Sequence, residues 1–387
     1  MSELRILLAT RTMAHGGGAE RLVFDIFQEL KQRANVKVKL VSFQHSSIFN
    51  LPNIDHFEKA LAADKDFKIC NYKINFSLVR KNEIDVTEYQ QLVEEFKPHV
   101  IHSHMFIAEL VTRANVHAGI KFFTHCHDNM VQLEKFSSQT PLSRNKLTNY
   151  YERNWILKKY AACNNQFIAI SNDTKEYFEN VLPKKLKKNI HLLYNAIDFK
   201  RLNAVNHERK LDTIKIVNTG NFLLKKNQIF LVEVMRCLKN RNANVSLTFL
   251  GGGDEMGNVK NKTAEYGLTD FLTFAGNVNN VEEHLKNANL YVHSAKYEPF
   301  GLVLLEAMAA GLPVIALDGK GNRDIVKNNV NGFFIKEQNA ELFADKIMTL
   351  MGNENKYREM SKNAVEFSSG FDIVNYTNKL LKIYESN

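Results

Sequence analysis

The sequence is poor in the features that mark disulfide-stabilised and membrane-spanning proteins. It has only four cysteines and six prolines in 387 residues. The cysteines follow neither metal-ligand spacing nor a pairing pattern, so we expect reduced thiols. No apolar run approaches the roughly 18–20 residues that span a bilayer, and the first residues lead directly into a strand-like segment, so no signal peptide is expected. These absences predict a cytoplasmic globular protein, with a length comfortable for two domains.

Basic residues outnumber acidic ones, and the formal net charge is +9. Residues 1–200 carry 28 basic and 21 acidic side chains, whereas residues 201–387 carry 23 and 21. The excess is visible at Lys158-Lys159 and in the lysine-rich segment 184–188. Such a run is commonly a solvated face, but it also suits peripheral contact with an anionic membrane, at about 1 kcal/mol per basic residue. No basic stripe with interleaved aromatics occurs, so nucleic acid is not expected as a partner.

Short apolar segments alternate with amphipathic ones, which predicts parallel sheets covered by helices on both faces. The alternation pauses in the polar segment 200–212 and then restarts. We therefore predict an α/β protein of two doubly wound, Rossmann-like domains that face a cleft, with residues 1–198 in the first and 199–370 in the second. The predicted strands are 4–9, 36–43, 72–76, 100–102, 121–124, 167–170, 191–194, 215–219, 245–250, 272–274, 290–293, 313–317 and 332–335.

One segment of the second half is the most informative about function. A tight loop at Gly301 precedes a predicted helix over 302–310, and a buried strand is predicted over 314–317. A loop that enters a helix offers free backbone N–H groups, which bind anions such as phosphate. Glu298 lies just before this site and Glu306 lies on the second turn of the helix. A phosphate site flanked by two carboxylates indicates a sugar nucleotide as the ligand.

This segment resembles the paired-glutamate motif of the retaining glycosyltransferases of family 4, also called group 1. The resemblance implies the two-domain B-type fold, in which residues 1–198 bind the acceptor and residues 199–370 bind the nucleoside-diphosphate sugar. It also implies that the C-terminal helix, 371–387, packs back on the N-terminal domain. No cofactor is implied.

The loop after the first predicted strand contains Gly17 and Gly18, followed by Glu20 and Arg21. A dinucleotide-binding loop needs a third glycine where Arg21 stands, and the second predicted strand leads into Gln44 rather than an acidic residue, so NAD is disfavoured. The loop instead resembles the Gly-Gly-x-Glu-Arg loop of family 4. The resemblance implies that Gly17 and Gly18 border the donor phosphates.

The first strand of the second half ends at Gly220 and is followed by two lysines. Lys226, at a predicted helix start, can neutralise phosphate as a point charge. The family pattern has this lysine, but it also has an arginine where this chain has Asn221. One of the two usual cations for the diphosphate is therefore missing. Either Lys225 replaces it, or Lys226 and the helix N-terminus hold the leaving group alone.

Four histidines follow two predicted strands. A histidine at the end of a strand is commonly a structural hydrogen-bonding group. The family carries a His-Asp pair near the donor sugar, and His127-Asp128 is the matching pair, with His125 the weaker candidate. His102 and His104 are expected to be structural or to line the cleft.

Two groups of side chains have a spacing that could suggest a metal site, but neither predicts one. The pair Asp64 and Asp66 has a spacing that other glycosyltransferases use for a divalent cation, but two carboxylates fall at this spacing often by chance. His125, His127 and Asp128 form one short segment, which supplies too few ligands. We expect that no bound metal is required.

The resemblance implies a retaining transferase in which the acceptor attacks the face that the diphosphate leaves, with a diphosphate oxygen as the base. The preferred prediction is transfer from a UDP-sugar to a glycan or lipid-linked saccharide in bacterial cell-surface polysaccharide synthesis, with peripheral contact at the inner face of the cytoplasmic membrane. The alternatives are a non-catalytic subunit that binds sugar nucleotide, a sugar-nucleotide epimerase of the same fold and, more distantly, an NAD-dependent oxidoreductase.

The expected catalytic residues are Glu298, Lys226 and His127. The expected donor contacts are Gly17, Gly18, Asn221, Lys225, Lys226, Gly252, Asn277, Val278, Glu298, Phe300, Gly301, Leu302, Val303 and Glu306, of which Gly252, Asn277 and Val278 resemble family positions that line the base pocket.

Overall fold

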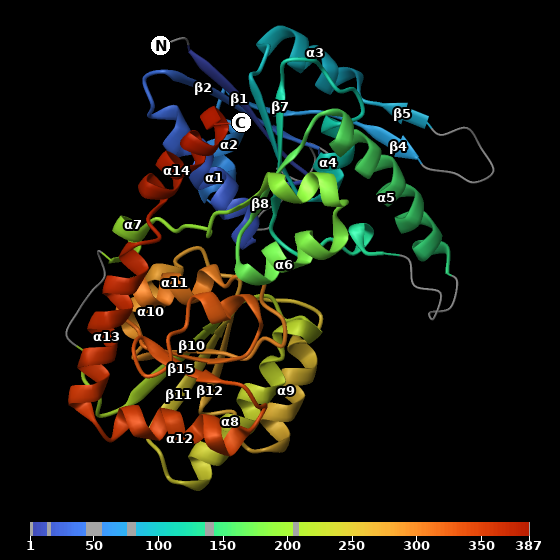
Figure 1. Ribbon diagram of the computed structural model, residues 1–387. Helices are drawn as coiled ribbons and strands as arrows, with labels where there is room; N and C mark the ends of the chain where they lie inside the picture. The colour runs from blue at the N-terminus through green and yellow to red at the C-terminus, as the bar shows by residue number, and fades with distance from the viewer. Residues whose placement is uncertain are drawn as a thin grey trace. The chain divides into compact units, whose positions relative to one another are not determined.

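The structure is a computed structural model that describes residues 3–13, 17–43, 56–75, 83–135, 143–203 and 209–386. The chain divides into two compact units, which Figure 1 draws with the N-terminal residues in blue and the C-terminal residues in red. The N-terminal unit comprises Met1–Tyr194 and Tyr376–Asn387, and the C-terminal unit comprises Asn195–Asn375. No helix among the described residues is both long enough and apolar enough to cross a lipid bilayer.

The N-terminal unit holds a seven-stranded parallel sheet in the order β3-β2-β1-β6-β7-β8-β9. Its strands are β1 (Leu4–Thr10), β2 (Val36–Ser42), β3 (Phe67–Ile69), β6 (Val100–His104), β7 (Lys121–Cys126), β8 (Gln166–Ala169) and β9 (Ile190–Leu192). Its helices are α1 (Gly18–Lys31), α2 (His56–Ala62), α3 (Thr87–Phe96), α4 (Phe106–Thr112), α5 (Arg144–Ala162), α6 (Asn172–Val181) and most of α14 (Ile373–Ser386). The strand order reverses between β1 and β6, and open sheets of this kind bind ligands at the carboxyl ends of the strands beside such a point.

The C-terminal unit holds a six-stranded parallel sheet in the order β12-β11-β10-β13-β14-β15. Its strands are β10 (Ile214–Thr219), β11 (Val245–Leu250), β12 (Leu272–Gly276), β13 (Leu290–His293), β14 (Val314–Leu317) and β15 (Gly332–Ile335). Its helices are α7 (Phe199–Asn203), α8 (Gln228–Asn240), α9 (Met256–Glu265), α10 (Val281–Asn287), α11 (Leu302–Ala309), α12 (Ala340–Met351) and α13 (Glu354–Ser369). Here the order reverses between β10 and β13.

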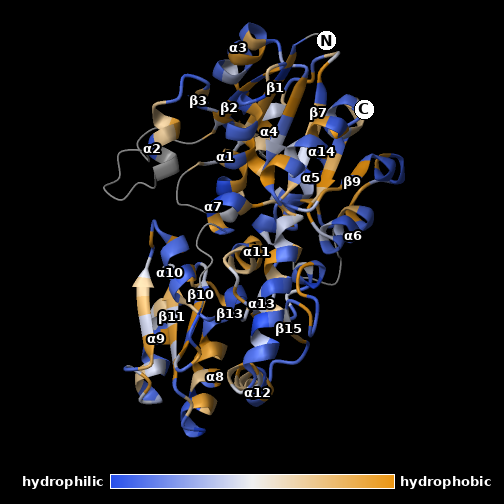
Figure 2. Ribbon diagram, turned by 90° about the vertical axis from the view of Figure 1, so that its left-hand side faces the viewer, coloured by the Kyte–Doolittle hydropathy of each residue, from blue (hydrophilic) through white to orange (hydrophobic). Residues whose placement is uncertain are grey.

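Apolar patterning accounts for these layers. In α1, Leu22, Val23, Ile26, Phe27 and Leu30 recur at helical spacing, and all are buried. The strands of both sheets are buried over most of their length, as sheets covered on both faces require. Figure 2 shows the hydrophobic colour concentrated on the strands and the hydrophilic colour on outward-facing parts of the helices. The predicted α/β class with two Rossmann-like sheets is confirmed.

The clearest difference from the predicted elements lies at β4 (Lys73–Asn75) and β5 (Glu83–Asp85). The segment 72–76 was predicted as a strand of the main sheet, but β4 pairs antiparallel with β5 in a separate ribbon. The third strand of the sheet is instead β3, whose three residues are too few to show a period. Gln44 and Gly16 lie outside the described residues.

Candidate active site

The strand order of the C-terminal sheet brings together segments that are about 70 residues apart in sequence. Strand β10 pairs directly with β13, because β11 and β12 lie on the other side of β10. The loop after β10 forms a short 3₁₀ turn, η4 (Leu224–Lys226), and the loop after β13 runs to the start of α11. The two loops are tied together by hydrogen bonds from Lys296 N to Lys225 O (2.8 Å) and from Ser294 Oγ to Lys226 O (2.8 Å). The candidate site lies at these two loops.

Three charged or titratable side chains meet there. Lys226 Nζ donates to Glu298 Oε2 at 2.6 Å, and His293 Nε2 lies 3.0 Å from the same oxygen. Glu298 and His293 are buried, at 7% and 2% exposure, and Lys226 is partly exposed. Oε2 thus takes both contacts, and no donor to Oε1 is found among the described residues. Glu298 therefore keeps one carboxylate oxygen available to a ligand hydroxyl.

The electrostatics of this group keep Glu298 ionised. Burial alone would raise the pKa of the Glu298 carboxyl, but the charge of Lys226 and the hydrogen bond from His293 outweigh burial and lower that pKa to about 2. A carboxylate in this state accepts hydrogen bonds and cannot donate a proton at neutral pH. The arrangement suits binding of hydroxyl groups rather than general-acid chemistry.

Helix α11 supplies the predicted anion site. Its N-cap, Gly301, has a φ of +104°, a left-handed conformation that favours glycine. No side chain caps the helix, and among the described residues the amides of Leu302 and Val303 have no hydrogen-bond acceptor. Such amides, at the positive end of the helix dipole, bind phosphate or other anions. Half-buried Glu306 lies further along the same helix, and together with Glu298 it contributes to a raised pKa of Tyr291, which results mainly from burial.

The glycine-rich strand ends pack against one another at the same edge of the sheet. Gly251 has a φ of +128°, and a Cβ there would lie 2.3 Å from Gly220 O, so only glycine allows this close approach. A Cβ on Gly252 would lie 3.4 Å from Asn277 Oδ1, so these two predicted residues are neighbours. Asn221 follows Gly220 directly and is exposed. Val278 is half-buried beside Asn277.

Two further lysines surround Tyr297, the residue before Glu298. The Nζ atoms of Lys225 and Lys320 each lie 5.9 Å from the centre of the Tyr297 ring. Lys320 has a φ of +73° and pairs with Glu298 through an isolated β-bridge. The site therefore has one lysine in contact with Glu298 and two more beside the neighbouring Tyr297, which is a favourable environment for an anionic ligand.

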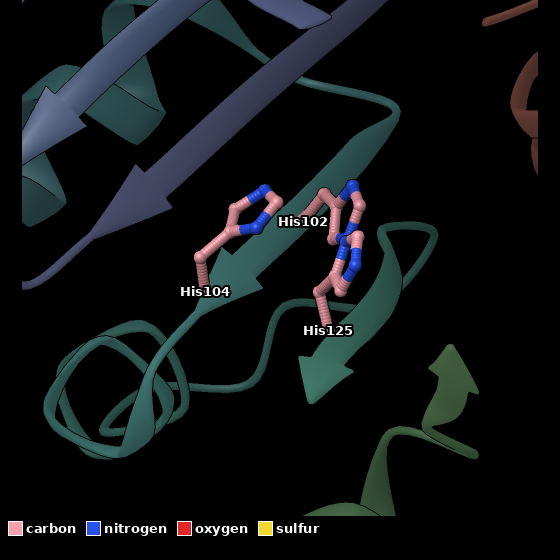
Figure 3. A group of neighbouring side chains, drawn as sticks. All are labelled: His102, His104 and His125. Atoms are coloured by element: carbon pink, nitrogen blue, oxygen red, sulfur yellow. The ribbon is translucent and has the colours of Figure 1, made fainter. Parts of the chain in front are cut away.

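The N-terminal unit places its own predicted residues at the corresponding edge of its sheet. Gly17 is the N-cap of α1 and Gly18 is the first residue of that helix, which follows β1. His104 Nδ1 lies 2.8 Å from His127 Nε2, and His102 Nδ1 lies 2.5 Å from the hydroxyl of Tyr384 on α14. Figure 3 shows His102, His104 and His125 gathered beside the adjacent strands β6 and β7.

Three histidines of this cluster, His102, His104 and His127, are neutral at neutral pH. Burial first, and then the neighbouring histidines, lower the pKa values of His102, His104 and His127 well below the usual range. Ligand nitrogens of His102, His104 and His125 lie within 4.8 Å of one another. Three histidine nitrogens at such distances can hold zinc, but the rings of His102 and His125 stack within 7° of parallel, as packed structural histidines do, and we assign no metal here. Nζ of Lys31 bridges Asp64 and Asp66, at 2.6 and 3.5 Å.

Comparison with protein families agrees with this geometry. Residues 199–367 match the family described as Glycosyl transferases group 1, and residues 16–201 match Glycosyltransferase Family 4. The chain belongs to the group 1, or family 4, glycosyltransferases. The first match spans nearly all of the C-terminal unit, and the second spans most of the N-terminal unit. The protein is therefore a glycosyltransferase.

Named relatives and solved structures of other glycosyltransferases resemble the chain over most of its length. A UDP-Gal:alpha-D-GlcNAc-diphosphoundecaprenol alpha-1,3-galactosyltransferase of Escherichia coli is 24% identical, over 80% of this chain and 81% of the relative. The capsular polysaccharide biosynthesis glycosyltransferase CapH of Staphylococcus aureus is 25% identical, over 77% and 80%. The crystal structure of Anabaena Alr3699/HepE in complex with UDP and glucose superposes with a TM-score of 0.78 at 19% identity, over 100% of both chains. The fold of this glycosyltransferase is thus the B-type fold.

The structure of this glycosyltransferase brings two predicted site residues into contact and adds two residues that were not predicted. Lys226 and Glu298 were predicted separately and are in contact. His293 and Lys320 were not predicted. His293 ends a buried strand beside the point where the strand order reverses, so the rule that ligands bind at carboxyl ends could have identified it. No sequence pattern could have identified Lys320, because a backbone turn sets its position.

Proposed function

We propose that this glycosyltransferase moves a sugar, with retention of configuration, from a UDP-sugar to a glycan or lipid-linked saccharide during synthesis of a bacterial cell-surface polysaccharide. The contact of Lys226 and His293 with Glu298, beside the uncapped N-terminus of α11, carries the proposal. A UDP donor is favoured because the HepE structure holds UDP and glucose and because the E. coli relative is named for UDP-Gal.

The diphosphate of the donor is assigned to cations and amides of the C-terminal unit. Lys226 neutralises the charge that grows on the leaving diphosphate, an electrostatic contribution that is commonly the largest in such reactions. The backbone amides from Phe300 to Val303 bind phosphate or sugar oxygens. Lys225 lies in the same loop and takes the place of the cation that Asn221 does not supply.

The sugar and ribose of the donor are assigned to carboxylates, and its base is assigned to residues at the glycine-rich strand ends of the C-terminal sheet. Glu298 accepts a hydrogen bond from a sugar hydroxyl through Oε1, and Glu306 accepts from the ribose hydroxyls. Gly252, Asn277 and Val278 line the base pocket. In the N-terminal unit, Gly17 and Gly18 border the phosphates and His127 contacts the donor sugar.

The chemistry follows from these placements. The acceptor hydroxyl attacks the anomeric carbon on the face from which UDP departs, and its proton passes to a diphosphate oxygen. Because Glu298 is held ionised, with a pKa of about 2, it does not act as the proton donor. Its negative charge instead binds hydroxyls and favours positive charge developing on the sugar ring.

The test is incubation with UDP-glucose, UDP-galactose and UDP-N-acetylglucosamine, each with and without an undecaprenyl-diphosphate-linked N-acetylglucosamine acceptor. We expect acceptor-dependent UDP release from one donor and, by proton NMR, an α-linkage in the product formed from the α-linked donor. A β-linkage would contradict retention. Conversion of a donor without acceptor would favour the epimerase, and tight UDP binding without turnover on any acceptor would favour the non-catalytic subunit.

A further inference from the structure

Helix α5 and the two short 3₁₀ turns beside it form a surface that the transfer reaction does not use. The turns are η2 (Val131–Leu133) and η3 (Lys184–Asn189). Three large apolar or aromatic side chains are exposed on α5 and η2: Val131 at 55%, Tyr150 at 45% and Tyr151 at 43%. We call Val131, Tyr150, Tyr151 and the four exposed lysines of η3 the α5 surface. In Figure 1, α5 lies along the outside of the N-terminal unit.

The three elements are fixed to one another. Arg153 of α5 donates from Nε to Leu133 O of η2 at 3.0 Å and from Nη2 to Val181 O, at the end of α6, at 3.1 Å. The turn η3 begins three residues after Val181, with Leu186 buried in the same apolar core as Leu133. Tyr150 lies one helical turn before Arg153 and therefore on the same side of α5. The exposed aromatic and basic groups thus belong to one packed substructure.

The charge of this region is strongly basic. Lys184, Lys185, Lys187 and Lys188 all lie on η3, and all are exposed. Helix α5 adds exposed Arg144 and Lys158. This accounts for much of the uneven basic excess of the first 200 residues. Two of the other basic side chains of α5, Arg153 and Lys159, bind backbone carbonyl groups.

We propose that the α5 surface docks the protein on an anionic phospholipid membrane. Tyrosine is enriched at membrane–water interfaces, where its ring lies at the level of the headgroups. Each lysine near an anionic bilayer adds attraction that falls off within a Debye length. A protein partner fits less well, because lysine is depleted in protein–protein interfaces whereas four lysines lie together here. This inference goes beyond the proposed transfer reaction and agrees with a lipid-linked acceptor.

The only tryptophan of the chain gives a direct probe of this docking. Trp155 lies on α5, one turn after Tyr151, where it is partly exposed, with Lys159 Nζ 5.3 Å from its ring centre. Its fluorescence is recorded while vesicles of phosphatidylglycerol and phosphatidylcholine are added to the full-length protein, without donor or acceptor. Vesicles of phosphatidylcholine alone are the neutral reference. We expect a blue shift with anionic vesicles only, and we expect added salt to reverse it.

Two sets of variants locate the contact. Changing the four η3 lysines to glutamine should weaken vesicle binding on the order of 100-fold, and Tyr150→Ser with Tyr151→Ser should weaken it about tenfold. The matched control removes the same charge from the exposed surface of the C-terminal unit. It changes Lys210, Lys286, Lys336 and Lys362 to glutamine. UDP binding and the melting temperature, measured in parallel, show that each variant is folded.

The outcomes are distinct. Loss of vesicle binding in the η3 and tyrosine variants, with retention in the control, supports the proposal. Equal binding to neutral vesicles, no binding to either kind, or equal loss in the control overturns it. Binding is measured without catalysis, so a failure here leaves the proposed transfer reaction standing, and a failure of transfer leaves the membrane contact standing.

Discussion

The two sheets place chemically opposite groups at the same topological position. In the C-terminal unit, the loops beside the reversal point bring Lys226, Glu298 and His293 together, with Glu298 held ionised. In the N-terminal unit, strands β6 and β7 end in packed histidines, of which burial keeps His102 and His104 neutral. The same fold geometry thus yields a charged site in one unit and an uncharged one in the other.

The difference separates two tasks that a sugar transferase must perform. A leaving diphosphate requires fixed positive charge, a role that the proposed function assigns to Lys226 and the α11 amides. The reacting sugar is uncharged, and the proposed function assigns to it a hydrogen bond from the neutral imidazole of His127, which is partly exposed. If this account is right, charge changes in the C-terminal unit should dominate activity, and pH should act on the two units in different ranges.

The largest effect is expected from Lys226→Ala. Loss of the cation on the leaving group should lower kcat/KM for the UDP-sugar by about 10²–10³-fold. Lys225→Ala, which removes the neighbouring charge, should cost less than about tenfold. Initial rates over a series of donor concentrations measure both. If folded Lys226→Ala enzyme kept a kcat/KM within threefold of wild type, Lys226 would not be the cation that stabilises the leaving group.

Acid should destabilise the C-terminal unit only at low pH. The pKa of Glu298 in the folded protein, about 2, lies below its ordinary value of 4.5. The carboxylate therefore stabilises the fold fully above about pH 4.5, and this contribution, roughly 3 kcal/mol, is lost as the pH falls toward 2. Urea unfolding below pH 5 should show this loss in wild type and a flatter profile in Glu298→Gln. Parallel profiles would contradict the assignment.

The N-terminal unit should respond to acid at a higher pH than the C-terminal unit. Because burial lowers the pKa values of His102, His104 and His127, these groups stabilise the fold above about pH 6.5, and the contribution is lost as the pH falls below it. Glu109 opposes this loss, since burial raises its pKa to about 7.

Hydrogen exchange followed between pH 8 and 5 separates the units. We expect protection to fall first in the N-terminal one. His102→Phe combined with Tyr384→Phe removes one imidazole and its hydroxyl partner, so the fall should be shallower in that variant. An identical fall in variant and wild type would show that His102 does not contribute.

The smallest effect concerns Asn221, which stands where the family carries an arginine. Asn221→Arg adds a second cation at the exposed start of the η4 loop, and UDP should bind about three- to fivefold more tightly. Calorimetric titration with UDP at low salt measures the change. Weaker binding would indicate that Asn221 itself contacts the donor and that the loop leaves no room for the larger side chain.

The sequence predicted the layers well and the contacts only in part. Periodicity predicted both sheets and the helix at Leu302–Ala309 because buried segments and caps are local properties. It did not predict that β10 pairs with β13, which decides that Lys226 touches Glu298, because strand order is not a local property. His102 and His104 were expected to be structural or to line the cleft, but their packing against His125 depends on the pairing of β6 with β7, which is not a local property.

The most direct test of the account is a calorimetric titration of UDP into wild type, Glu306→Gln and Glu337→Gln, with and without Mg²⁺. Glu306 on α11 is the residue proposed to bind the ribose, and Glu337 is an exposed glutamate of the same unit that serves as the matched control. We predict that UDP binds to wild type and Glu337→Gln alike, with or without Mg²⁺, and about tenfold or more weakly to Glu306→Gln. Equal UDP affinity in all three proteins, or no UDP binding at all, would contradict a donor site at the edge of the C-terminal sheet.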